Sequence, residues 1–279
     1  MFCIHHNDLD GYASARLVAE YTDNFDKERY FEWDYFGNIP IEKIQKNEKV
    51  YIVDCSFSEH TIEILKSIQR ITNDIIWIDH HKTTMELIQN HEELGNIKGM
   101  RVNDISAAAL TYMFLYKQGI NEIPLYIRMI SDYDTWKYEY GKDTEYFFCY
   151  MESMDYKNIN DNVWILLKDE HFLRDHILEN GKMIKRYIEK KYQVIKNEIS
   201  YEKDIDGHKA LIINSEGNSW LFGEDIEKYD LCVKWIYTGN RYKYTIYSHS
   251  NVDASLIASK YGGGGHKAAA GFSSDKQIW

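Results

Sequence analysis

A run of four bulky apolar residues, Ile75–Ile78, is followed directly by the tripeptide Asp79-His80-His81. An apolar run without polar alternation is typical of a strand that is buried on both faces, as the central strands of parallel sheets are. The tripeptide should then lie at the carboxyl end of that strand, the edge where open α/β sheets carry their binding sites. Two imidazoles and a carboxylate on a rigid strand end suit metal binding.

The amino terminus repeats this pattern. Phe2–His5 is predicted to be a short strand, and the six residues after it read His-Asn-Asp-Leu-Asp-Gly. Their alternation directs the side chains of His6, Asp8 and Asp10 to one side while the backbone is extended. The chain is then expected to turn into a helix over residues 12–21. A second group of potential ligands therefore follows a second strand.

Two later segments supply further carboxylates. Val50–Val53 is predicted to be a third buried strand, and it ends at Asp54. The mostly apolar stretch 127–130 leads into two aspartates, Asp132 and Asp134, either of which could face the same site. Four segments that are distant in the sequence thus end in side chains able to bind a cation.

The mixture of donors favours a pair of hard cations. Carboxylate oxygens together with neutral imidazoles suit Mn²⁺, with Mg²⁺, Co²⁺ and Zn²⁺ as alternatives. The carboxylates outnumber what one divalent ion needs. A second ion, with one carboxylate bridging the two ions, would relieve the mutual repulsion of the carboxylates. Two ions about 3.5–4 Å apart can hold a hydroxide between them and neutralise phosphate oxygens while a phosphoester is cleaved.

The four motifs, in this order, resemble those of the DHH phosphoesterase superfamily. The sequence Gly-Gly-Gly-Gly-His-Lys-Ala-Ala-Ala-Gly over residues 262–271 is similar to the signature of the DHHA1 domain, which follows the DHH domain in many members. The amino-terminal motif, paired with Tyr-Asp-Thr-Trp at residues 133–136, is most similar to the NrnB-type oligoribonucleases, or nanoRNases. The resemblance spans residues 6–272.

The resemblance implies a set of metal ligands, with Asp54 bridging the two ions. The implied ligands are His6, Asp8, Asp10, Asp54, His80 and Asp134. His5 stays open as an alternative to His6, because some relatives space this histidine three residues before the aspartate. Asp132 stays open as an alternative to Asp134.

The resemblance also implies catalytic and substrate-binding residues. His81 would face the scissile phosphate as a proton donor or an electrostatic clamp, and Asp79 would orient an imidazole or the backbone turn. Ser106 is mainly a helix N-cap signal and also a candidate substrate contact. The glycine run leaves backbone amides open to an anion or a base. Its implied substrate contacts are Gly263, Gly264, Gly265, His266 and Lys267.

One position departs from the family. Many DHHA1 domains carry an arginine on the strand before the glycine run, where it clasps a substrate phosphate, and this chain has Tyr247 at that place. A tyrosine can stack on a base or donate one hydrogen bond, but it cannot form a bidentate pair with a phosphate. Recognition of a terminal phosphate is therefore less expected here than in those relatives.

The length of 279 residues fits two compact domains. We expect an α/β DHH domain over residues 1–150, with a doubly wound and mostly parallel sheet. Residues 151–200 are expected to form a helical connector, and residues 201–279 a smaller α+β DHHA1 domain.

Charge and composition restrict the partners and the location. A net charge of −11 disfavours tracking of a long duplex, which needs extended basic surfaces. The apolar runs are too short to cross a membrane, and the start of the chain lacks a signal-peptide pattern. The four scattered cysteines suggest reduced, buried thiols and hence a cytoplasmic protein. The sequence leaves a homodimer open.

Together these features predict a metal-dependent phosphodiesterase that hydrolyses short single-stranded oligonucleotides to 5′-mononucleotides. The alternatives within the enzyme class are a phosphodiesterase of cyclic or linear dinucleotides and a pAp phosphatase. From another class, a catalytically silent nucleotide-binding module is the alternative. A processive exonuclease of the RecJ type is disfavoured, because basic grooves for long DNA are lacking.

Overall fold

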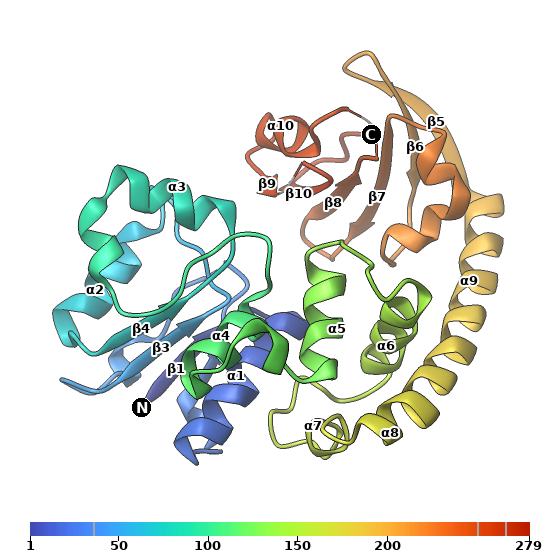
Figure 1. Cartoon of the computed structure of the whole chain (residues 1–279). Helices are drawn as coiled ribbons and strands as arrows, with labels where there is room; N and C mark the ends of the chain where they lie inside the picture. Colours follow the sequence, from blue (N-terminus) through green and yellow to red (C-terminus); the bar gives the residue numbers. More distant parts are fainter. Residues whose placement is uncertain (36, 250, 266) are drawn as a thin grey trace. The chain divides into compact units, whose positions relative to one another are not determined.

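The computed structural model describes residues 1–35, 37–249, 251–265 and 267–279 (Figure 1). The chain divides into two compact units, Met1–Ile184 and Lys185–Trp279. Helix α9 (Glu179–Ile199), in the region expected to form a helical connector, crosses this division.

The first unit is built on a parallel sheet of four strands. Because the strands are parallel, their carboxyl ends lie along one edge of the sheet. Every residue of the three strands expected from unbroken apolar runs is buried. In sheet order the strands are β2 (Tyr30–Glu32), β1 (Phe2–His5), β3 (Val50–Val53) and β4 (Ile75–Ile78).

Helices cover both faces of this sheet. Alternate strand residues belong to two apolar clusters, so Tyr51 packs with α1 and α4 while Trp77 packs with α2 and α3. This arrangement confirms the doubly wound α/β fold. The helices of the unit are α1 (Leu9–Thr22), α2 (Ile62–Ile71), α3 (Lys82–Asn90), α4 (Ala107–Tyr116), α5 (Leu125–Asp134), α6 (Lys142–Glu152), α7 (Val163–Leu166) and α8 (Glu170–Phe172).

The second unit is a mixed sheet of six strands with α10 (Ala254–Ser259) on one face, which confirms the smaller α+β fold. Strands β6 and β7 pair in parallel, and the other neighbours pair antiparallel. The strands, in sheet order, are β5 (Ser200–Ile205), β6 (His208–Ile213), β7 (Leu231–Tyr237), β8 (Tyr242–Tyr247), β10 (Ala269–Ser274) and β9 (Gly264–Gly265). In the described part of the chain, each helix is too short or too polar to cross a membrane.

Candidate metal centre

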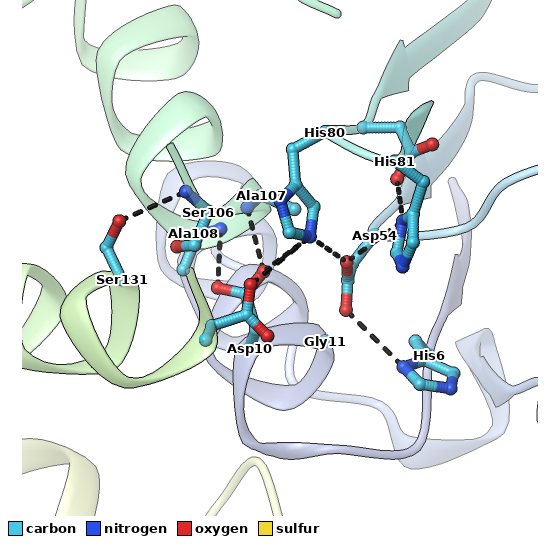
Figure 2. Close-up of polar contacts among 12 residues, drawn as sticks. His6, Asp10, Gly11, Asp54, His80, His81, Ser106, Ala107, Ala108 and Ser131 are labelled. Atoms are coloured by element: carbon cyan, nitrogen blue, oxygen red, sulfur yellow. Dashed lines mark hydrogen bonds and ion pairs between the residues drawn. The ribbon is translucent and has the colours of Figure 1, made fainter. Parts of the chain in front are cut away.

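Titratable side chains from three strand ends and two helices meet at the carboxyl edge of the first sheet (Figure 2). They form three overlapping groups, and within each group the potential ligand atoms lie within 4.8 Å of one another. The groups are His6, Asp8 and Asp54; Asp54, His80 and His81; and Asp10, His80 and Asp134. The structure thus brings all six predicted ligands together with His81.

Asp54 lies at the centre of this constellation, between two histidines (Figure 2). Its Oδ2 is 3.6 Å from His6 Nδ1, and its Oδ1 is 3.4 Å from His80 Nε2. The residue is 1% exposed, and neither carboxylate oxygen has a hydrogen-bond donor among the described residues. Its backbone is left-handed, with φ of 56°, which is uncommon outside glycine and aims the side chain at the neighbouring strand ends.

A buried carboxylate without donors is costly, so the partner that fits Asp54 is a cation. Burial raises the pKa of Asp54 well above its usual value, and the nearby charges of Asp8 and Asp10 raise it further. A divalent ion would remove this penalty by neutralising the carboxylate. The surrounding oxygens and imidazole nitrogens form a donor set that suits Mn²⁺ and similar ions.

The start of helix α4 holds Asp10 in place. The carboxylate accepts hydrogen bonds from the amides of Ala107 at 2.7 Å and Ala108 at 3.0 Å (Figure 2). These unpaired amides form the positive end of the helix dipole, which favours a carboxylate. Asp10 Oδ2 also lies 4.0 Å from His80 Nε2. The sequence gives no sign of this contact, because its partners are backbone groups.

Ser106 supports the same helix start. The side chain is fully buried and accepts a hydrogen bond from the amide of Ala109, so the expected N-cap is confirmed. Its own amide donates to Ser131 Oγ at 3.0 Å. Contact between Ser106 and a substrate stays a prediction.

Asp8 links the first ligand group to helix α1. Its Oδ1 accepts from the amide of Gly11 at 2.9 Å and caps the helix, while its Oδ2 lies 2.8 Å from His6 Nδ1. A Cβ at Gly11 would come within 2.3 Å of the His6 carbonyl oxygen, so only glycine fits at this position. Burial opposes protonation of His6, but Asp8 and Asp54 outweigh it and raise its pKa to about 11.

The two histidines after β1 have different surroundings. His5 is 2% exposed, its Nδ1 is 2.8 Å from the carbonyl oxygen of His6, and its ring packs edge-on against Tyr12. Burial lowers its pKa to about 4. The structure therefore places His6 in the ligand groups and His5 in the core.

The two aspartates at the end of α5 also differ. Asp134 Oδ2 is 3.3 Å from His80 Nε2 and belongs to a ligand group. Asp132 instead accepts from the amides of Glu139 at 2.7 Å and Tyr140 at 3.2 Å, and from the hydroxyl of Thr144. Asp132 therefore holds the loop after α5, a role that sequence reasoning missed because both partner amides belong to an irregular segment.

We expect Asp132→Ala to lower the free energy of unfolding by about 2–3 kcal/mol, because its donors would lose their acceptor inside the protein. Urea denaturation with Mn²⁺ present measures this change. The exposed carboxylate of Asp155 offers the control, and Asp155→Ala should change stability by less than about 0.5 kcal/mol. Equal effects of the two substitutions would contradict the role given to Asp132.

Asp79 and His81 form a buried pair beside the ligand groups. Asp79 is fully buried, and its Oδ1 lies 2.8 Å from His81 Nδ1. Its Oδ2 accepts from the hydroxyl of Thr84, a contact that the sequence did not reveal. Burial opposes protonation of His81, yet Asp79 outweighs it and raises the pKa of the imidazole. The pair fixes Nδ1 as the protonated nitrogen and directs Nε2 away from Asp79.

The glycine run in the second unit pairs with a strand. Gly264 and Gly265 form the edge strand β9 against β10. A Cβ at Gly263 would lie 2.1 Å from the carbonyl oxygen of Gly271, whereas one at Gly264 would meet open space. Lys267 is exposed, and His266 lies outside the described residues. Close packing of the backbone therefore explains Gly263, and substrate contacts by this run stay a prediction.

Tyr247, at the position of the family arginine, lies in the core of the second unit. It is 8% exposed, and its ring packs edge-on against Phe222 with centroids 6.0 Å apart. Stacking on a base from this position, one of the options that the sequence left open, is therefore wrong for this conformation.

Comparison with known proteins finds a family model and two relatives that are similar to this chain. Residues 1–133 match the model of the DHH family, N-terminal domain. The chain is 27% identical to Oligoribonuclease NrnB of Bacillus subtilis, over 98% of this chain and 73% of that protein. It is 25% identical to the uncharacterized protein R106 of Acanthamoeba polyphaga mimivirus, over 94% of this chain and 64% of that protein.

Solved structures support the fold. The chain is similar to the pGpG-specific phosphodiesterase PggH of Vibrio cholerae, with a TM-score of 0.54 at 13% identity, over 98% of this chain and 93% of that one. It is also similar to an exopolyphosphatase-related protein of Bacteroides fragilis, with a TM-score of 0.54 at 12% identity, over 99% and 87% of the two chains. The side chains of the four motifs meet at one sheet edge, and residues 1–133, which carry most of them, match the DHH family, N-terminal domain.

Proposed function

We propose that this protein is a metal-dependent phosphodiesterase that hydrolyses short single-stranded oligonucleotides, RNA foremost, to 5′-mononucleotides. The observation that carries the proposal is Asp54, a buried carboxylate with no hydrogen-bond donor among the described residues, held between His6 and His80. Two divalent cations, Mn²⁺ foremost, would be held on either side of it by the six side chains of the ligand groups.

The cations would supply Lewis acidity at the phosphate oxygens and lower the pKa of a water molecule. The protein contributes the fixed geometry. Asp10 is held by the start of α4, and Asp8 by the start of α1, so neither carboxylate has to reorganise during the reaction. The left-handed backbone of Asp54 keeps its two oxygens directed at different histidines.

His81 is the proposed general acid. The Nδ1–H of His81 donates a hydrogen bond to Asp79. The imidazolium can therefore give the proton on Nε2 to the departing sugar oxygen. Asp79 raises the pKa of His81, which favours the protonated imidazole. Thr84 and Asp79 act by positioning this imidazole.

A short substrate also fits the charge of the chain. With a net charge of −11, the protein repels a long polyanion except where cations and a few basic side chains lie. The relative in Bacillus subtilis is named an oligoribonuclease, which agrees with this choice. The four cysteines are buried thiols, which supports a cytoplasmic location.

A substrate panel tests the proposal. With Mn²⁺ we expect cleavage of an RNA pentamer and of linear pGpG to 5′-mononucleotides, identified by mass, and a loss of at least about 100-fold in EDTA. A cyclic dinucleotide and pAp complete the panel, and Mg²⁺ and Co²⁺ identify the preferred ion. Preference for pAp, or nucleotide binding without turnover, would overturn the proposal in favour of a phosphatase or a silent module.

A further inference from the structure

The loop after Asp134 presents a large aromatic side chain to solvent. Trp136 is 41% exposed, although tryptophan is among the residues with most to gain from burial. Its backbone is left-handed, with φ of 58°, and Tyr138 repeats this conformation with φ of 52°. Bulky residues rarely adopt this conformation, and such strain is concentrated at functional sites.

Hydrogen bonds hold this loop in one conformation. The buried Asp132 accepts from the amides of Glu139 and Tyr140 through its side chain, and from the amide of Lys137 at 3.1 Å through its carbonyl. The amide of Trp136 donates to the carbonyl of Tyr133 at 3.1 Å. The indole is therefore carried by a loop that is fixed on the protein.

The end of α5 supports the loop from the other side. The ring of Tyr133 stacks on Phe148 with centroids 3.7 Å apart, and it lies 6.1 Å from the ring of Tyr138 in an edge-on contact. Tyr138 in turn lies edge-on to Trp136 at 6.3 Å. These aromatic contacts leave the indole partly exposed rather than enclosing it.

The position of Trp136 in the chain ties it to the metal centre. It follows Asp134, whose Oδ2 is 3.3 Å from His80 Nε2, by only two residues. A substrate phosphate at the ligand groups would thus bring its nucleosides close to this loop. A flat aromatic ring accepts any unpaired base, because every base has a π-face, and a base inside a duplex has no face to offer.

We propose that Trp136 is a stacking platform for a nucleobase of the substrate. This inference rests on the proposed function and deepens it, because it makes an unpaired base, rather than a terminal phosphate, the feature that is recognised. Stacking tolerates all four bases, so the protein would select short single strands without regard to their base sequence.

Kinetics on a ribodinucleotide test the role of the ring. Trp136→Leu keeps an apolar side chain but removes the π-face, and we expect it to raise KM about tenfold with kcat within twofold. Trp136→Phe keeps a π-face and should raise KM less than about threefold. Tyr21→Leu is the control, since Tyr21 is 51% exposed at the far end of α1.

Dinucleotides that lack one base separate stacking from a general structural role. For the wild type, a dinucleotide without the stacked base should have a KM raised as much as Trp136→Leu raises it on the complete dinucleotide. On the abasic dinucleotide, Trp136→Leu should raise KM no further. If Trp136→Leu raises KM by the same factor on the complete and the abasic dinucleotides, or if it leaves KM unchanged on both, the proposal is wrong.

Binding without turnover keeps this test distinct from that of the proposed function. By calorimetry with Mn²⁺, the wild type should bind AMP about tenfold more tightly than ribose 5-phosphate, and Trp136→Leu should abolish the difference. A difference that persists in the variant overturns the stacking role. A wild type that cleaves none of the oligonucleotides overturns the proposed function alone.

Discussion

Asp54→Asn is expected to abolish hydrolysis and at the same time to stabilise the metal-free protein. In the proposed mechanism, loss of the Asp54 carboxylate would remove several kcal/mol of transition-state stabilisation, so activity with Mn²⁺ should fall about 1,000-fold or more. The metal-free fold should gain about 1–3 kcal/mol, because a buried carboxyl with a raised pKa and no hydrogen-bond donor becomes an amide of the same shape. Asparagine also tolerates the left-handed backbone at this position.

Two measurements on purified protein check this pair of effects: the rate on an RNA pentamer with Mn²⁺, and urea denaturation in EDTA. Asp74→Asn is the matched control, because Asp74 precedes β4 at the opposite edge of the same sheet and its side chain is 50% exposed beside Lys49. Asp74→Asn should change the free energy of unfolding by less than about 0.5 kcal/mol and leave the cleavage rate nearly unchanged. A metal-free Asp54→Asn protein less stable than the wild type would contradict the burial penalty inferred for Asp54.

Divalent cations are expected to stabilise the folded protein strongly. An ion present at 1,000 times its dissociation constant adds about 4 kcal/mol to the free energy of unfolding. Thermal unfolding with Mn²⁺ and with EDTA should therefore differ by many degrees in Tm. Equal Tm values in the two conditions would mean that the six side chains hold no ion.

The gain from metal should grow between pH 6.5 and pH 8. In the unfolded chain His6 releases its proton near pH 6.5, whereas in the metal-free folded protein its pKa is about 11. The folded state then binds more protons, so its stability falls as pH rises, by about 1.4 kcal/mol per pH unit for each such group. Asp54 acts in the same direction. Its carboxyl is already ionised in the unfolded chain at these pH values, whereas burial raises its pKa in the folded protein.

Metal binding has the opposite dependence on pH, since it needs deprotonated ligands. His5 acts only weakly in the opposite direction, because its folded pKa is about 4 and the unfolded chain binds only part of a proton there at pH 6.5. The control is His6→Gln in EDTA, whose stability should change less between the two pH values. A metal-free wild type equally stable at pH 6.5 and pH 8 would contradict the charge distribution of the centre.

The features that were predictable from the sequence are those fixed by local pattern. Short, mostly apolar runs that end in polar residues are typical of strands buried on both faces, so β1, β3 and β4 were found with their bounds nearly right. Because parallel strands end at one edge, the ligands after these strands could be placed together without knowing any contact.

The features that were missed depend on contacts between distant segments. Strand β5 was not expected, because its residues alternate only weakly, and pairing with β6 decides its conformation. Asp132 and Asp134 carry the same side chain two positions apart on α5 and so point to different sides of the helix. Only the packing of α5 decides which one faces His80. The left-handed backbone of Asp54 has no sequence signal either, because aspartate is compatible with several conformations.

The hold of α4 on Asp10 has a consequence for how the protein is made. The amides of Ala107 and Ala108 follow their acceptor by 97 and 98 positions, and Asp134 comes later still. Since a ribosome produces the amino terminus first, Asp8 and Asp10 are made long before Asp134. The ion pair of the proposed function would therefore have to wait for its ligands until the end of α5 has left the ribosome, and shorter nascent chains should not capture it.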